Sequence, residues 1–213
     1  AMDDFSGPER EWLERALEQA DGEPGLEHRF VVGHIGPYSS GPHGNNQRMH
    51  AQGVPDLLRK HHVDLVFAGH DHIYERGEAD GLKYIVTGGA GAPLYPIRRV
   101  LATTAKVEAS HHWVEVAVDG PTVKARAVRL DGTVIESCSY RLGEPWTCDA
   151  PPAPKTPPVA TVPSPKASSS KCGCEVPGGA AEGSRGAISV AGLALSLVAY
   201  ARRRRPFGGR RRA

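Results

Sequence analysis

The chain has 213 residues, which is long enough for one domain with a hydrophobic core plus appended segments. Its formal net charge is +2, but residues 202–213 contain seven arginines and no acid, so the preceding residues carry 2 − 7 = −5. This distribution argues against a nucleic-acid-binding protein, because such proteins concentrate basic residues on the folded domain rather than in a terminal tail.

Periodic patterns in the first half indicate helices alternating with buried strands. Residues 8–20 place apolar side chains at helical spacing and predict an amphipathic helix. Residues 54–62 predict a second helix, with Pro55 in its first turn. The predicted buried strands are 28–33, 63–68 and 83–87. The order of strand, helix and strand with short polar links favours a βαβ unit.

The following part of the chain is rich in β-forming residues. The predicted strands are 113–118, 122–130 and 133–142, separated by Asp119-Gly120 and Asp131-Gly132, which are strong hairpin signals. We therefore expect an α/β fold, arranged as an α+β sandwich, that occupies residues 1–147.

Composition changes sharply after this domain. Residues 149–171 contain seven prolines and almost no large apolar side chain, which predicts an extended linker over 148–171. In the remaining segment, 172–213, an apolar stretch from Ala187 to Ala201 precedes the arginines and predicts a hydrophobic tail helix. Its fifteen residues are fewer than the about 20 usual for a membrane span, whereas the arginine block suits a membrane boundary.

Four cysteines are present, in two pairs. Cys138 and Cys148 flank the end of the folded domain, and a disulfide between them is expected if the protein is exported. Cys172 and Cys174 have only one residue between them, which is a poor spacing for a structural zinc site.

Histidines follow two of the predicted strands. His70 and His72 come directly after the strand 63–68, and His34 comes directly after the strand 28–33. His70 and His72 are two residues apart, so they share a face if the segment is extended. Neutral imidazoles are common metal ligands, and this arrangement therefore predicts a metal site at the ends of the strands.

The sequence around these histidines resembles a known family. Residues 69–76, Gly-His-Asp-His-Ile-Tyr-Glu-Arg, resemble the GHxHxxxR block of calcineurin-like metallophosphoesterases, and especially the GHxHxYER form of purple acid phosphatases. Residues 31–44 are similar to their VxxH block, which is followed by a Pro-x-Tyr-Ser-Ser segment and a later histidine. The resemblance covers residues 5–142, and it implies the C-terminal half of a four-layer αββα fold.

The resemblance also implies roles for individual residues. His34 and His70 would bind one metal of a binuclear pair, and His72 would bind the other. The ions would be Fe, Zn or Mn, either divalent or trivalent. His43 would contact the phosphate or donate a proton to the leaving group. Asn45 and Asn46 could bind phosphate oxygens, although asparagine in a Gly-rich loop is more often a turn residue. Two ions about 3.5–4 Å apart polarise a phosphoryl oxygen and lower the pKa of a bound water.

Several other polar residues are interpreted as structural. Arg76 is expected to pair with an acid near its loop, and Asp64 to support the start of a strand. Gly88–Gly91 is a structural turn in this family and lacks the Lys-Ser/Thr of a phosphate-binding P-loop. The remaining histidines match no ligand block and are expected at the surface, at a helix end or before a strand: His28, His50, His61, His62, His111 and His112.

Three motifs of the family do not occur in this sequence. They are an Asp block, a Gly-Asp block that supplies the bridging carboxylate, and a Gly-Asn-His block. We therefore expect a metal-dependent phosphoric ester hydrolase, a phosphomonoesterase or phosphodiesterase, of which these residues are the C-terminal half and are nearly inactive alone. The alternative is a non-catalytic surface module that retains the fold. The gene upstream of Ala1 distinguishes the two.

The C-terminal segment resembles the tripartite sorting tail of myxobacterial surface proteins, through Cys172-Gly173-Cys174, the apolar stretch and the arginines. This resemblance implies an exported enzyme at the cell surface or outer envelope, processed by a sorting protease, with the linker as a stalk. An ordinary membrane tail anchor is the alternative. The partners expected are thus a phosphate ester and the cell envelope, and no nucleic acid.

Overall fold

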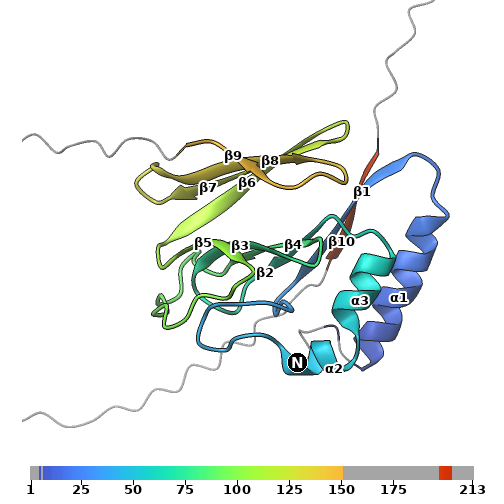
Figure 1. Cartoon of the computed structure of the whole chain (residues 1–213), viewed down its shortest axis with the longest axis horizontal. Helices are drawn as coiled ribbons and strands as arrows, with labels where there is room; N and C mark the ends of the chain where they lie inside the picture. Colours follow the sequence, from blue (N-terminus) through green and yellow to red (C-terminus); the bar gives the residue numbers. More distant parts are fainter. Residues whose placement is uncertain (1–4, 6, 151–196, 203–213) are drawn as a thin grey trace, which may run out of the picture. The chain divides into compact units, whose positions relative to one another are not determined.

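Ten strands in two β-sheets and three helices make up the part of the chain described by the computed structural model, namely Phe5, residues 7–150 and residues 197–202. The larger sheet has the strand order β10-β1-β2-β4-β3-β5, and the smaller sheet has the order β6-β7-β8-β9 (Figure 1). The helices are α1 (Pro8–Asp21), α2 (Gln47–Ala51) and α3 (Val54–Lys60). The strands of the larger sheet are β1 (Leu26–Gly33), β2 (Leu65–Ala68), β3 (Tyr74–Ala79), β4 (Leu82–Thr87), β5 (Thr104–Glu108) and β10 (Leu197–Arg202). Those of the smaller sheet are β6 (His112–Asp119), β7 (Thr122–Arg129), β8 (Val134–Arg141) and β9 (Thr147–Cys148).

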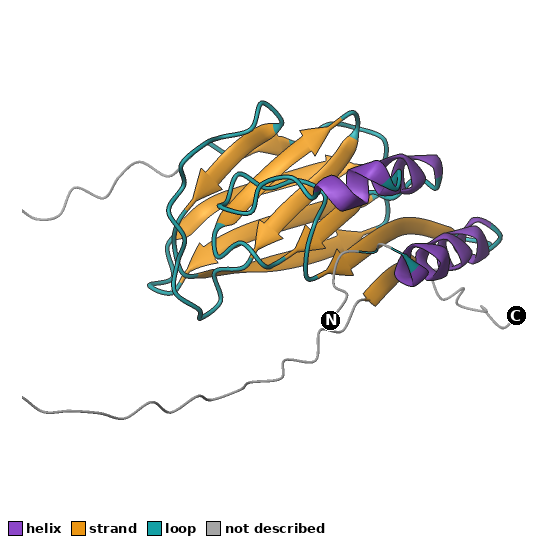
Figure 2. Cartoon of the chain, turned by 90° about the horizontal axis from the view of Figure 1, so that it is seen from below, coloured by secondary structure: helices purple, strands orange, loops and turns teal. Residues whose placement is uncertain are grey.

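The larger sheet is buried on both faces. Alternate residues of one strand enter different clusters, because successive side chains point to opposite sides of a sheet. Val31 of β1 packs with the helices, whereas the preceding Phe30 packs against the smaller sheet. Tyr84 and Ile85 of β4 divide in the same way. Figure 1 places α1 and α3 on the side of the larger sheet that faces away from the smaller sheet, and Figure 2 shows the helices gathered at one side of the strands. The described residues thus form a helical layer and two sheets, which confirms the predicted mixed α/β fold.

Parallel pairing at the centre of the larger sheet determines where the loops gather. β2 pairs in parallel with β1 on one side and with β4 on the other, and α2 and α3 form the crossover between β1 and β2. The predicted βαβ unit is confirmed. Gly33 at the end of β1 lies opposite Ala68 at the end of β2, so the segments that follow both strands leave the sheet at one edge.

Most predicted elements are present, and four further ones were not expected. The helices 8–20 and 54–62 correspond to α1 and α3, and the Asp-Gly hairpins connect β6 to β7 and β7 to β8. The short helix α2 and the strands β3, β5 and β9 have no prediction. β3 begins inside the histidine block itself, at Tyr74, and pairs antiparallel with both β4 and β5.

The prediction of a tail helix from Ala187 to Ala201 is wrong for the residues that the structure describes. Leu197–Arg202 form β10, which pairs antiparallel with β1 at the edge of the larger sheet. An edge strand has free backbone donors and acceptors on one side, and a segment containing Val and Tyr is suited to pair with them. The rest of the predicted helix, and most of the predicted linker, lie outside the described residues. Among the helices described, none is long and apolar enough to span a membrane.

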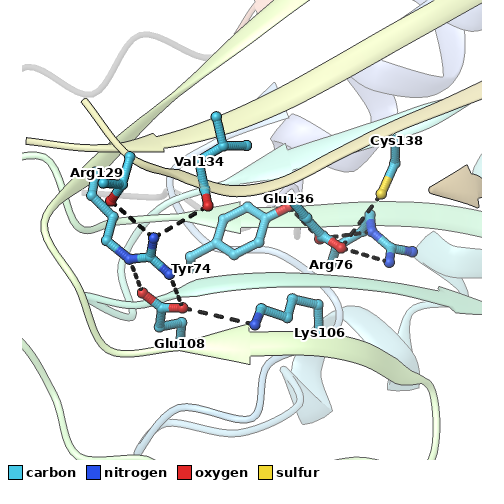
Figure 3. A network of polar contacts seen from close by, with 9 residues as sticks. Tyr74, Arg76, Lys106, Glu108, Arg129, Val134, Glu136 and Cys138 are labelled. Carbon is cyan, nitrogen blue, oxygen red and sulfur yellow. Dashed lines mark hydrogen bonds and ion pairs between the residues drawn. The ribbon is translucent and has the colours of Figure 1, made fainter. Parts of the chain in front are cut away.

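Charged side chains connect the two sheets (Figure 3). Arg76 of β3 donates two hydrogen bonds to Glu136 of β8, at 2.8 and 2.9 Å, and the Tyr74 hydroxyl donates to the same carboxylate at 2.7 Å. Arg129 of β7 donates to Glu108 of β5 at 2.6 and 2.7 Å, and these bonds hold the pKa of Glu108 below its usual range. The structural role predicted for Arg76 is confirmed, but its partner lies in the other sheet rather than near the loop.

A disulfide joins Cys138 of β8 to Cys148 of β9. The two residues face each other across the antiparallel pair, so the bond secures the short terminal strand to the smaller sheet. The ring of Trp146, just before β9, packs edge-on against Tyr140 and lies 5.4 Å from the Arg76 guanidinium carbon. The Cys138–Cys148 disulfide, which the sequence predicts for an exported protein, is therefore present.

Removing the carboxylate of the buried ion pair should destabilise the protein strongly. The side chains of Arg76 and Glu136 are only 8% and 11% exposed. Glu136→Ala leaves the guanidinium without its partner, and breaking such a pair from one side costs about 3–5 kcal/mol of the free energy of unfolding. Urea denaturation followed by tryptophan fluorescence measures the loss.

Glu115→Ala is the matched control, because it removes the partner of Arg126 in an exposed pair on the same sheet. Exposed ion pairs contribute little to stability, so this variant should unfold close to the wild type. Equal destabilisation by the two substitutions would contradict a dominant role for the buried pair.

Candidate active site

The edge where β1 and β2 end brings two predicted ligands into contact. Nε2 of His34 and Nδ1 of His70 are 3.1 Å apart. The Gly69 amide donates to the His34 carbonyl at 2.9 Å, which holds the two loops together. Nitrogens that bind one ion at about 2.1 Å are separated by about 3.0–3.4 Å in octahedral or tetrahedral geometry. The observed spacing therefore fits a single shared ion.

The environment of His70 favours the neutral imidazole that a metal requires. Burial lowers the pKa of His70 below its usual value, and the nearby His43 and His34 lower it further. The residue has a left-handed backbone, with φ of 59°, which is uncommon outside glycine and turns the chain sharply after β2.

His72 is oriented by a backbone carbonyl. Its Nδ1 lies 2.7 Å from the Pro93 oxygen, and because a carbonyl only accepts, this nitrogen carries the proton. Nε2 is thereby left as the ligand atom, an arrangement frequent among metal-binding histidines. The ring of Tyr95 stacks on His72 with centroids 4.2 Å apart, and the Tyr95 amide donates to the His72 carbonyl at 3.2 Å.

His34, His70 and His72 do not form one compact ligand set. Among the described residues, the group of three His, Cys, Asp or Glu ligand atoms that lie within 4.8 Å of one another is Glu136, Cys138 and Cys148. Those two cysteines are bonded to each other, which removes them as thiolate ligands. The assignment of His72 to a second ion stays a prediction.

The residue between the two histidines, Asp71, supports His43. Its carboxylate is almost completely buried and lies 2.6 Å from Nδ1 of His43. The Ser39 hydroxyl donates to the other carboxylate oxygen. His43 therefore donates its Nδ1–H to Asp71, and its Nε2 is not used in this contact. Its ring lies against His70, with centroids 4.1 Å apart.

Two glycines make room for this carboxylate. A Cβ atom at Gly41 would lie 2.2 Å from Cγ of Asp71, and one at Gly88 would lie 2.2 Å from the Asp71 carbonyl oxygen. Neither contact is tolerable, so both positions require glycine. The structural role predicted for Gly88–Gly91 is thus confirmed at Gly88, which packs closely against the backbone of the histidine block.

A second buried carboxylate anchors the loop that carries His43. Glu75 is fully buried and accepts hydrogen bonds from the Ser40 amide at 2.6 Å and the Ser40 hydroxyl at 2.9 Å. The hydroxyls of Thr104 and Tyr84 donate to it as well. Burial raises the pKa of Tyr84 to about 12, so its hydroxyl remains a donor at neutral pH. Asp71 and Glu75 thus hold consecutive serines of one loop.

The asparagines of this loop have structural contacts. Oδ1 of Asn45 accepts from the Ser39 amide at 3.4 Å, and Asn46 caps α2 by accepting from the amides of Arg48 and Met49. The phosphate contact predicted for Asn45 stays a prediction.

Histidines outside the site bind backbone groups or carboxylates. His111 and His112 contact the carbonyls of Gly89 and Ser110, which confirms their structural reading, and burial lowers the pKa of His112. The surface position expected for His28 is wrong. This side chain is 1% exposed and donates to the Gly120 carbonyl of the other sheet, beside Asp64. His61 ends α3 as expected but is buried, with Nδ1 2.7 Å from Asp21.

Asp71, Glu75 and Tyr95 contribute to the site without having been predicted. The two acids stand inside the histidine block, but their alternation with the histidines would assign faces only in an extended segment, and the left-handed backbone of His70 breaks that pattern. Tyr95 is 23 residues beyond His72, and no spacing rule connects the two.

Comparison with known proteins identifies relatives of this site. A family model described as calcineurin-like phosphoesterase matches residues 2–74, the segment that contains His34, His43, His70 and His72. Purple acid phosphatase 7 of Arabidopsis thaliana is 38% identical over 64 residues, which are 30% of this chain and 19% of that protein.

The fold has a relative among solved structures. Purple acid phosphatase PPD1 from yellow lupin (Lupinus luteus) superposes with a TM-score of 0.55 at 21% identity, over 64% of this chain and 29% of that one. The chain thus spans less than a third of the length of either phosphatase. Residues 2–74 thus match the calcineurin-like phosphoesterase family, and the chain is similar to purple acid phosphatases over part of its length.

Proposed function

We propose that this chain supplies part of the active site of a metal-dependent phosphoric ester hydrolase. The observation that carries the proposal is the contact between His34 and His70, whose ring nitrogens are 3.1 Å apart beside the His43–Asp71 pair. Metal-ligand spacing and an oriented histidine thus occur at one edge of the sheet. Relatives named as phosphatases support the same reaction class.

The residues have distinct tasks in such a reaction. His34 and His70 would hold one ion and Nε2 of His72 would contribute to a second. Bound metal ions supply a Lewis acid for the phosphoryl oxygen and a water with a lowered pKa. As the imidazolium, His43 donates its Nε2 proton to the departing oxygen or to a phosphate oxygen and becomes neutral. Asp71 accepts from Nδ1 and stabilises the imidazolium, and Tyr95 and Pro93 fix the orientation of His72.

The described residues leave the ligand set incomplete. Asp71 is adjacent to the histidines, but Ser39 and His43 already occupy its oxygens. We therefore propose that the bridging carboxylate comes from a residue other than those that the structure describes. A non-catalytic surface module with this fold is the second candidate, and the lack of a free carboxylate beside His34 and His70 among the described residues favours it.

The disulfide is relevant to the cellular compartment of the protein. Disulfides persist in oxidising compartments and are rare in the cytosol, so the Cys138–Cys148 bond supports an exported protein. Together with the resemblance of the C-terminal segment to a sorting tail, it leads us to propose display at the cell surface, with anchorage in the envelope.

Metal binding by the chain itself should depend on His34. Titration of the 213-residue protein with Co²⁺, followed by absorbance, should show at least about tenfold weaker binding in His34→Asn, because one of two ligands is lost. Binding should weaken as the pH falls through the lowered pKa of His70, since protons compete for the imidazole. His62→Asn, at an exposed histidine, is the control, and equal weakening in both variants would refute the site.

Hydrolysis tests the proposed activity. The longest translated product containing these residues is loaded with Fe, Zn or Mn and assayed with p-nitrophenyl phosphate. His70→Asn should lower kcat/KM by at least about 100-fold, because the metal that activates water is no longer held. The 213-residue chain alone should be nearly inactive. If no metal supports hydrolysis, or if His70→Asn is as active as the wild type, the non-catalytic module is the better description.

Asp71 should affect turnover more than substrate binding. Asp71→Asn keeps the side-chain size but no longer fixes the proton on Nδ1 of His43, so kcat should fall about tenfold or more while KM changes little. Asp56→Asn, at an exposed position of α3, is the control. An unchanged kcat in Asp71→Asn would show that Asp71 only supports the fold.

A further inference from the structure

A small cavity adjoins the loop that carries His43. It has a volume of about 210 Å³ and is lined on one side by residues 39–42 and Gly44 and on the other by Arg98 and Arg99. His43 lies between two of the lining residues, Pro42 and Gly44. The cavity and the catalytic histidine therefore share one loop.

Both walls of this cavity are held in place. On the loop side, Ser39 and Ser40 bind the buried carboxylates of Asp71 and Glu75. On the arginine side, the Leu101 amide donates to the Ser40 hydroxyl at 3.0 Å, and Tyr95 is stacked on His72. Ile97 and Leu101 also pack partly buried against the core. The arginines are thus attached to a backbone that is fixed to the site on either side of them.

Arg98 and Arg99 have no counter-charge. Both are exposed, and within the described part of the chain neither side chain has a hydrogen-bond or ion-pair partner. No acid lines the cavity. The two carboxylates that bind the loop wall, Asp71 and Glu75, are buried and already accept hydrogen bonds from hydroxyl, amide and imidazole groups. By contrast, Arg76, Arg126 and Arg129 each have a carboxylate within 3 Å.

A larger cavity has a different character. It measures about 680 Å³ and lies near the opposite ends of the strands, where Glu27, Asp64 and Glu78 stand among Arg29 and Lys83. Mixed charge of this kind attracts neither sign strongly. The small cavity beside His43 carries charge of a single, positive sign, and guanidinium groups bind phosphate through paired, charge-assisted hydrogen bonds.

We infer that Arg98 and Arg99 form a second anion subsite, which binds a further phosphate of a substrate whose reacting phosphate lies at the histidines. This inference rests on the proposed function and specifies its substrate class: organic diphosphates and polyphosphates rather than simple monoesters. Hydrolysis then consumes one water, releases the phosphate at the histidines and leaves the other on the arginines.

Pyrophosphate binding to the metal-free chain tests the subsite without any activity. Isothermal titration in the presence of EDTA should show that Arg98→Ala/Arg99→Ala weakens binding at least about tenfold, since two charged donors are lost. Arg98→Lys/Arg99→Lys keeps the charge without the planar fork and should give an intermediate loss. The control, Arg15→Ala/Arg141→Ala, removes the same charge from exposed positions elsewhere. Equal weakening in the control, or no pyrophosphate binding by the wild type, overturns the subsite.

Kinetics separate this inference from the proposed function. In a preparation that hydrolyses p-nitrophenyl phosphate, Arg98→Ala/Arg99→Ala should leave KM for that monoester within about twofold and raise KM for a nucleoside diphosphate at least about fivefold. Equal KM changes for both substrates overturn the subsite and leave the hydrolase standing. If no preparation hydrolyses the monoester, the proposed function fails, and the pyrophosphate titration still decides whether the arginines bind an anion.

Discussion

Parallel pairing of β1 with β2 is the constraint from which the site follows. A parallel pair places the carboxyl ends of both strands at one edge, so the residues that follow them meet even though they are 36 positions apart. Gly33 faces Ala68 in the register, and the next polar side chains, His34 and His70, come into contact. A shift of one residue in this register would exchange the faces of β2 and remove the contact.

The octapeptide 69–76 has two functions that alternate along it. His70 contacts His34 and His72 stacks on Tyr95, whereas Asp71 and Glu75 turn inward and bind the loop that carries His43. Burying two carboxylates is costly unless each is fully hydrogen-bonded, and both are. Serine hydroxyls, backbone amides and an imidazole meet that demand, which explains why the loop contains consecutive serines.

How much of this was predictable depends on the range of each signal. Helical spacing identifies α1, and buried apolar segments identify β1, β2 and β4, because those patterns are local. The contact of His34 with His70 follows from the predicted βαβ unit. Tyr95 and Arg99 were not recognised because their positions depend on the path of residues 88–103, which has no periodic pattern. β10 was misassigned as helix because small apolar residues suit either structure, and the unpaired edge of β1 decides between them only in three dimensions.

Strand β3 connects the stability of the sandwich to the geometry of the site. Its successive residues face opposite sides: Tyr74 and Arg76 bind Glu136 of the smaller sheet, and Glu75 between them binds Ser40. The contacts between the sheets therefore position β3, and the hydrogen bonds of Glu75 with Ser40 connect β3 to the loop that carries His43. The same loop forms one wall of the arginine cavity, and the Leu101 amide on Ser40 joins the other wall to it. Displacement of β3 would thus move the candidate proton donor and the arginine pair together, so a rigid sheet interface is a requirement for both.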